Sequence, residues 1–123
     1  MTLELLEKEY AVCRLNTPVF PKGEFVSLTV SAGEISLVCE AAQVPPDSVV
    51  EPGWRGLRVV GTLDFSLIGI LANLTEALAK AGVSVFAVST YDTDYLFVKA
   101  GSLYQAIRAL EDSGHEVTGL QTK

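Results

Sequence analysis

The sequence has little of what enzymes and metal proteins build their sites from: one histidine and two cysteines among 123 residues. It carries no Gly-rich phosphate loop and no His/Cys cluster at metal-ligand spacing, which disfavours phosphate chemistry and a metal centre. His115 follows Gly114 at the end of a helical pattern, and we expect it at the surface. Cys13 and Cys39 both lie in apolar, strand-like runs. They are predicted to be buried free thiols in a reducing cytoplasm, not part of a disulfide framework.

Long hydrophobic runs and basic patches are also missing. No apolar segment approaches the roughly 20 residues of a membrane helix, and residues 1–9 alternate Leu with Glu and Lys instead of following a signal-peptide plan. A net charge of −6 and a pI near 4.6 argue against nucleic acid and anionic membranes as partners. The hydrophobic share of 49% and the mean hydropathy of +0.34 still indicate a filled core. We therefore expect a soluble, acidic, cytoplasmic protein without a cofactor.

The first half of the chain contains a set of short strand patterns. Residues 10–15 form an apolar run, residues 25–30 alternate in polarity, and residues 35–38 return as a hairpin partner. Residues 43–53 contain three prolines and are predicted to be a connection with at most short structure.

The second half predicts an ordered series of longer elements. Four leucines recur at alternating four- and three-residue steps, which is typical of the buried face of a helix; they are Leu67, Leu71, Leu74 and Leu78. The predicted elements, in order, are strand 57–63, a helix from Ser66 to a stop at Gly82, strand 83–89, strand 95–99, a helix from Ser102 to a stop at Gly114, and strand 116–120. This β-α-β-β-α-β order implies an α+β fold with a four-stranded antiparallel sheet covered on one face by two helices.

The strand predicted over residues 83–89 is apolar on both of its faces. The face of the sheet away from the helices must therefore be covered, either by the amino-terminal half or by another copy of the chain. Oligomerisation is expected on this ground alone.

Between two apolar runs lies a polar turn of six residues, Ser89-Thr90-Tyr91-Asp92-Thr93-Asp94. Loops between strands usually need about two to five residues and favour Gly, Asn or Pro, and this one has none of them. It carries hydroxyls, two carboxylates and an aromatic ring, which is more than a turn requires. Because small-ligand sites place a few polar groups on an apolar frame, the turn is a candidate ligand site.

Three segments of the second half resemble the ACT domain, a small-molecule-binding module that regulates amino-acid metabolism: WRGLRV (54–59), LDFSLIGIL (63–71) and STYDTDY (89–95). More specifically, they look like a family of short bacterial tandem ACT proteins related to the CASTOR-type arginine sensors of animals. The resemblance implies a ferredoxin-like βαββαβ ACT domain over residues 57–123. It also implies that residues 1–56 form a shortened ACT-like unit whose helices are very short or missing.

In proteins of this kind the ligand lies where the first strand meets the first helix, against the strand and turn that follow, commonly at an interface between two domains. The resemblance assigns that place to eight residues: Asp64, Phe65, Ser66, Gly69, Ile70, Thr90, Tyr91 and Asp94. Free N–H groups in the first turn of the helix suit an amino acid's carboxylate, and Gly69 allows close approach. Asp94 and Thr90 can accept hydrogen bonds from an ammonium or a guanidinium. In the CASTOR-type sensors an acidic residue at the place of Asp94 contacts the arginine side chain.

Five of these residues also have a structural interpretation. Asp94 can cap its own turn, and either Asp64 or Ser66 can be the N-cap of the helix. Phe65 is expected to anchor the loop, and Tyr91 to pack over the hairpin.

The function that the resemblance implies is a non-catalytic, amino-acid-binding regulatory protein. A homodimer is expected because the animal sensors contain four such units in one chain and this chain supplies two. A regulatory protein partner is a further expectation, and arginine and a neutral amino acid both fit as the ligand. Two alternatives stay open: a structural interaction module that binds no ligand, and a small enzyme, since ferredoxin-like folds also host phosphatases and isomerases.

Overall fold

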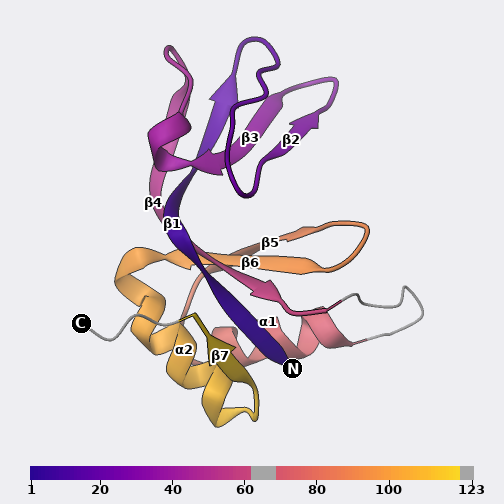
Figure 1. The fold of residues 1–123 in the computed structure, drawn as a ribbon, viewed down its shortest axis with the longest axis vertical. Helices are drawn as coiled ribbons and strands as arrows, with labels where there is room; N and C mark the ends of the chain where they lie inside the picture. The colour runs from indigo at the N-terminus through magenta and orange to yellow at the C-terminus, as the bar shows by residue number, and fades with distance from the viewer. Residues whose placement is uncertain (62–68, 120–123) are drawn as a thin grey trace. The chain divides into compact units, whose positions relative to one another are not determined.

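The computed structural model describes residues 1–61 and 69–119 of the chain (Figure 1). By contact the chain groups into two units: unit 1 comprises Met1–Glu7 and Arg55–Lys123, and unit 2 comprises Lys8–Trp54. Two long strands, β1 (Thr2–Leu15) and β4 (Val49–Val59), each contribute residues to both units. The sequence-based division into 1–56 and 57–123 differs from this grouping, because Met1–Glu7 join the unit that contains the second half.

Unit 1 has the predicted βαββαβ order. After β4 the elements are α1 (Ile70–Lys80), β5 (Val85–Ser89), β6 (Asp94–Lys99), the short 3-10 helix η2 (Ala100–Ser102), α2 (Leu103–Asp112) and β7 (Glu116–Thr118). Figure 1 shows both helices on one side of the sheet, as predicted.

The sheet of unit 1 differs from the predicted four antiparallel strands. Its strand order is β7-β1-β4-β6-β5, and β7 pairs with β1 in parallel, with Leu3 opposite Val117. The start of β1 is a fifth strand that the sequence analysis did not assign. Its physical basis is the Leu and Glu alternation of residues 3–5, in which Leu3 and Leu5 are buried and Glu4 is half-buried. That alternation is the period-two pattern of a strand with one face in a core.

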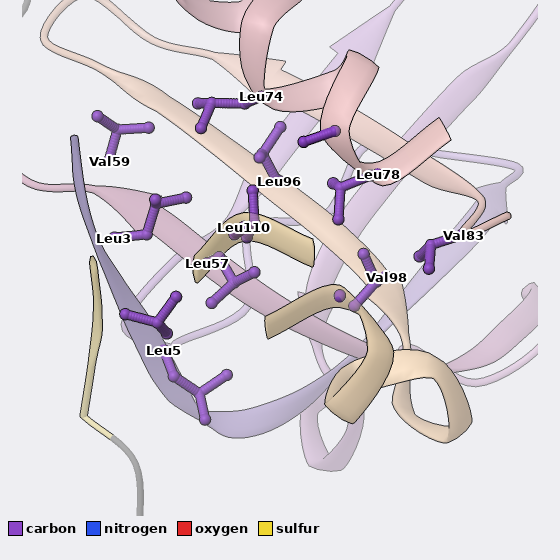
Figure 2. Close-up of a cluster of buried hydrophobic side chains, with 13 residues drawn as sticks. Leu3, Leu5, Leu57, Val59, Leu74, Leu78, Val83, Leu96, Val98 and Leu110 are labelled. Atoms are coloured by element: carbon purple, nitrogen blue, oxygen red, sulfur yellow. The ribbon is translucent and has the colours of Figure 1, made fainter. Parts of the chain in front are cut away.

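The core of unit 1 lies between the sheet and its two helices (Figure 2). α1 contributes Leu74, Ala77 and Leu78, and α2 contributes Ala106 and Leu110. Strand residues from β1, β4, β6 and β7 fill the other side of the same cluster. The helical spacing of the leucines therefore identified the buried face of α1, where Leu74 and Leu78 have no exposed surface.

The predicted helix boundaries hold except at the start of α1. Ser102 is the N-cap of α2, and Gly82 and Gly114 follow the two helices with φ of 74° and 93°. α1 begins at Ile70, not at Ser66, and its N-cap is Gly69, which has a left-handed φ of 83°. Gly69 thus takes the N-cap place for which the sequence offered Asp64 or Ser66, both of which lie outside the described residues, and its left-handed conformation is one that glycine adopts readily.

The opposite face of the sheet in unit 1 carries an apolar layer of its own. The rings of Phe86 and Phe97 face each other across β5 and β6 and stack with their centroids 4.9 Å apart. Gly56 lies beneath Phe97, since a Cβ there would stand 2.8 Å from Phe97 Cε2 and 2.9 Å from Leu6 Cδ1. The strand predicted over residues 83–89 is apolar on both faces, but the residues of β5 are half-buried or exposed, because β5 stands at the edge of the strand order.

Unit 2 is a small sheet with little helix. Strands β2 (Ser27–Val30) and β3 (Ile35–Glu40) form the predicted hairpin, and β3 also pairs with β1. The only helix in this unit, all of which the structure describes, is the three-residue 3-10 helix η1 (Ala41–Gln43). The segment 43–53 was predicted to be a connection, but β4 begins within it at Val49.

The two cysteines are buried in unit 2 and free, as predicted. Cys13 and Cys39 belong to a core cluster with Ala11, Leu15 and Leu37. Burial raises the pKa of the Cys39 thiol to about 12 and also raises the pKa of Cys13, so both groups stay protonated near neutral pH. Among the described residues, no helix is long and apolar enough to cross a membrane.

Candidate functional site

The turn between β5 and β6 is shorter than the sequence indicated. Ser89 pairs with Asp94 across the two strands, so the turn comprises residues 90–93 and not six residues. The Ser89 hydroxyl donates to Oδ1 of the half-buried Asp94. The carboxylate of Asp94 is therefore held by a neighbouring side chain, and not by a bond to its own turn as the structural interpretation expected.

Thr90 uses its hydroxyl to close this turn. Its backbone N–H donates to Thr93 O over 2.8 Å, and its Oγ1 donates to the same oxygen over 3.1 Å. The same hydroxyl accepts from Thr93 N–H over 3.2 Å. Tyr91, next in the turn, is 81% exposed, so most of its surface is open to solvent.

Thr93 is a polar residue that the sequence analysis did not select, and it is only 6% exposed. Its Oγ1 donates to the carbonyl of Val59, the last residue of β4, over 2.7 Å. This bond fixes the turn against the end of the strand that precedes α1. No local signal reveals it, because the acceptor is a backbone oxygen 34 positions away.

Thr93→Val is expected to lower the free energy of unfolding by about 1–2 kcal/mol, because it leaves a buried carbonyl without its donor. Urea denaturation measures this loss. Thr93→Ser should restore most of it, since the hydroxyl returns. The matched control is Thr118→Val, because Thr118 makes a longer, 3.4 Å bond to Leu3 O from an exposed position. Equal losses for Thr93→Val and Thr118→Val would contradict the role assigned to Thr93.

The start of α1 supplies the second half of the candidate site. The N–H of Asn73, in the first turn of α1, donates to Gly69 O over 2.9 Å. Because α1 begins at Ile70, the N–H groups of its first turn form the positive end of the helix. Gly69 is exposed, and a Cβ added to it would meet nothing within 4 Å. Ile70 is half-buried and packs against the core of unit 1.

The structure brings five of the eight predicted site residues to one end of unit 1. Thr90, Tyr91 and Asp94 belong to the hairpin, and Gly69 and Ile70 to the start of α1. In Figure 1 the tip of the hairpin, the end of β4 and the start of α1 lie on the same side of the unit. Asp64, Phe65 and Ser66 lie outside the described residues.

His115, which the sequence predicts at the surface, makes a side-chain contact with α1. It is half-buried, and its Nε2 lies 2.8 Å from Oδ1 of Asn73 on α1. Burial lowers the pKa of this imidazole. His115 therefore joins the segment after α2 to the first turn of α1.

Two kinds of polar group are available at this end of unit 1. One is the Asp94 carboxylate, which accepts a hydrogen bond from Ser89, and the other is the set of backbone N–H donors at the start of α1. A carboxylate attracts an ammonium or guanidinium, and helix N-terminal amides attract an anion. Across residues 1–61 and 69–119, no three His, Cys, Asp or Glu side chains are grouped to hold a metal ion. The two polar components are complementary to the two charged ends of an amino acid.

Three solved structures illustrate what the chain is similar to. A protein of Agobacterium tumefaciens is 31% identical, with a TM-score of 0.88 over 99% of this chain and 94% of that one. The ligand-free regulatory subunit of aspartate kinase from Thermus thermophilus is 11% identical, with a TM-score of 0.66 over 91% of this chain and 96% of that one. Aspartate kinase from Clostridium acetobutylicum is 15% identical, with a TM-score of 0.67 over 90% of this chain and 33% of that one. The two kinase structures share the fold.

A comparison with protein-family models gives the family directly. None of the curated proteins matches the sequence. The family model described as ACT domain matches residues 49–112, which run from the first residue of β4 to the last residue of α2. That match covers more than half of the chain and includes both helices of unit 1. The chain belongs to the ACT domain family.

Proposed function

We propose that this chain is a non-catalytic regulatory protein that binds an amino acid at an interface between ACT units. The observation that carries the proposal is the half-buried Asp94 carboxylate, which accepts a hydrogen bond from Ser89 at the same end of an ACT domain as the N-terminus of α1. ACT domains are regulatory modules, and one of the similar structures is the regulatory subunit of an amino-acid kinase. Two free, buried thiols also fit a protein of the reducing cytoplasm.

The proposed pose places the ligand's carboxylate on the N–H groups of residues 69–72. Its ammonium, or a guanidinium at its far end, contacts Asp94. This shifts the anion contact from the residues 66–70 expected from sequence to the observed start of α1 at Ile70. Gly69 leaves the approach open, and Ile70 supplies apolar surface. Because its hydroxyl closes the turn, Thr90 contributes mainly by shaping the hairpin.

Three further residues complete the proposed site. Asp64, Phe65 and Ser66 precede α1 and are carried over from the family resemblance. Tyr91 is a candidate lid over the ligand, because its ring is largely exposed at the tip of the hairpin.

We place the chain in the tandem ACT subfamily related to the CASTOR-type sensors, with unit 2 as the shortened unit. What supports this is the element order β1, connection, β2, β3, η1, β4, which repeats the order of unit 1 with the two helices reduced. Arginine is the ligand that the subfamily implies. A neutral amino acid whose ammonium is held by Asp94 fits the same residues.

The proposed assembly is a two-fold symmetric homodimer. β5 stands at an edge of the strand order and carries the half-buried Val85, Phe86 and Val88, which a second copy can cover. Light scattering at micromolar concentration should give twice the chain mass of 13.2 kDa. A mass of one chain, unchanged by added ligand, would rule out the dimer.

A thermal-shift panel of the twenty amino acids tests the proposed function. A ligand present at 100 times its Kd stabilises the fold by about 2.7 kcal/mol, and a domain of this size then melts several degrees higher. We expect one amino acid or a chemically related pair to raise Tm, with the other amino acids as internal controls. A flat panel would favour the alternative of an interaction module without a ligand.

A further inference from the structure

A cavity of about 210 Å³ lies in unit 2, apart from the residues assigned to the site in unit 1. Leu15 is buried and Val19 is half-buried at this cavity, and both belong to the core of the unit or pack against it. Pro45 adds a half-buried ring to the same lining. Part of the lining is thus apolar and belongs to the core of unit 2 or packs against it.

The exposed part of the same cavity is polar. Asn16, Thr17 and Asp47 line it and are each exposed to solvent. Asp47 is the only charged residue of the lining. In the described part of the chain, no ion pair or hydrogen bond is found for its carboxylate.

The cavity has a clear origin in the sequence. Its lining residues come from the end of β1 with the connection that follows it, and from the segment after η1. In the order of elements along the chain, these two segments correspond to α1 and α2 of unit 1. Short irregular segments cover less of a sheet face than two helices. The Ser48 hydroxyl donates to Pro45 O over 2.6 Å and holds the second segment in shape. The hollow is therefore framed by proline rings and a side-chain hydrogen bond.

We propose that this cavity binds a small organic cation, a primary ammonium or guanidinium compound with a short apolar chain. The carboxylate of Asp47 supplies the charge, Asn16 and Thr17 supply hydrogen-bonding groups, and Leu15 and Val19 take the apolar chain. The cavity is smaller than the ~300 Å³ lower end of drug-sized pockets, so the ligand has only a few non-hydrogen atoms. This site is independent of the function proposed for unit 1.

The test is a titration of the ¹⁵N-labelled full chain with n-butylammonium chloride, followed by amide chemical shifts. Sodium butyrate, of matched size and opposite charge, is the control ligand. We expect saturable shifts at residues 16, 17, 47 and 48 with the ammonium and none with butyrate. Asp47→Asn should raise Kd at least about fivefold, consistent with the loss of a charge-assisted hydrogen bond.

Two features of the chain keep this test interpretable. Asp47 has a left-handed φ of 65°, a conformation that asparagine also adopts readily, so Asp47→Asn preserves the backbone. Glu24→Gln, which removes an exposed carboxylate elsewhere in unit 2, should leave Kd unchanged. The proposal is overturned by linear, non-saturating shifts, by equal binding of butyrate, or by equal loss of affinity in the two variants.

Discussion

Replacing Leu78 with alanine is expected to lower the free energy of unfolding by about 2–5 kcal/mol. Leu78 has no exposed surface and lies in the core cluster between α1 and the sheet of unit 1 (Figure 2). Truncation removes buried methyl groups and leaves a cavity that its leucine and valine neighbours only partly fill. The loss is large against a typical stability of about 5–15 kcal/mol for a whole domain. Urea denaturation followed by circular dichroism measures it.

Leu71→Ala is the matched control for Leu78→Ala. It makes the same chemical change in the same helix, but Leu71 is half-buried and only packs against the core. Its loss should be clearly smaller, since less apolar surface returns to water. If Leu71→Ala cost as much as Leu78→Ala, the assignment of the buried face of α1 would be incorrect.

Asp94→Asn is expected to weaken binding of the amino-acid ligand by about 1.5–3 kcal/mol, roughly tenfold to a hundredfold in Kd. The substitution keeps the shape of the side chain and an oxygen that can accept from Ser89, and it removes only the charge. A ligand ammonium or guanidinium then loses a charge-assisted hydrogen bond. Calorimetric titration of both proteins with the amino acid that gives the largest thermal shift measures the change.

A control variant and a second measurement separate a ligand contact at Asp94 from a structural role. Asp92→Asn removes a charge two residues away, from an exposed position in the turn, and should change Kd far less. Unfolding of Asp94→Asn without ligand should match wild type closely, because the Ser89 bond is retained. Equal ligand affinity in wild type and Asp94→Asn would remove Asp94 from the site.

The parts of the fold that were predictable are those with a local cause. Ser102 was identified as a helix start, and Gly82 and Gly114 as helix stops, from their neighbours alone. The leucine spacing of α1 gave its buried face for the same reason. Cys13 was placed in a core because its own strand is apolar.

The errors arose where distant residues or backbone conformation decide the outcome. The start of α1 was predicted too early because Leu67 continues the helical spacing of the leucines in the sequence. Gly69 takes a left-handed conformation, and α1 begins at the residue after it. The first residues of β1 were not predicted to be a strand, since their pairing partner β7 lies at the other end of the chain.

The candidate site was predictable in part for related reasons. The family resemblance led to Asp94, but its partner Ser89 follows only from the hairpin register, once the turn is counted as four residues. Thr93 was missed because its acceptor belongs to β4.

Calorimetric titration of the purified full chain with each of the twenty amino acids decides whether an ACT unit of this chain binds an amino acid. We predict saturable heat for at least one of them, with a fixed number of ligands bound per interface between ACT units. The Kd should rise in Asp94→Asn and not in Asp92→Asn. Absence of saturable heat for all twenty at millimolar concentration, from a protein that melts cooperatively, would contradict amino-acid binding at this site.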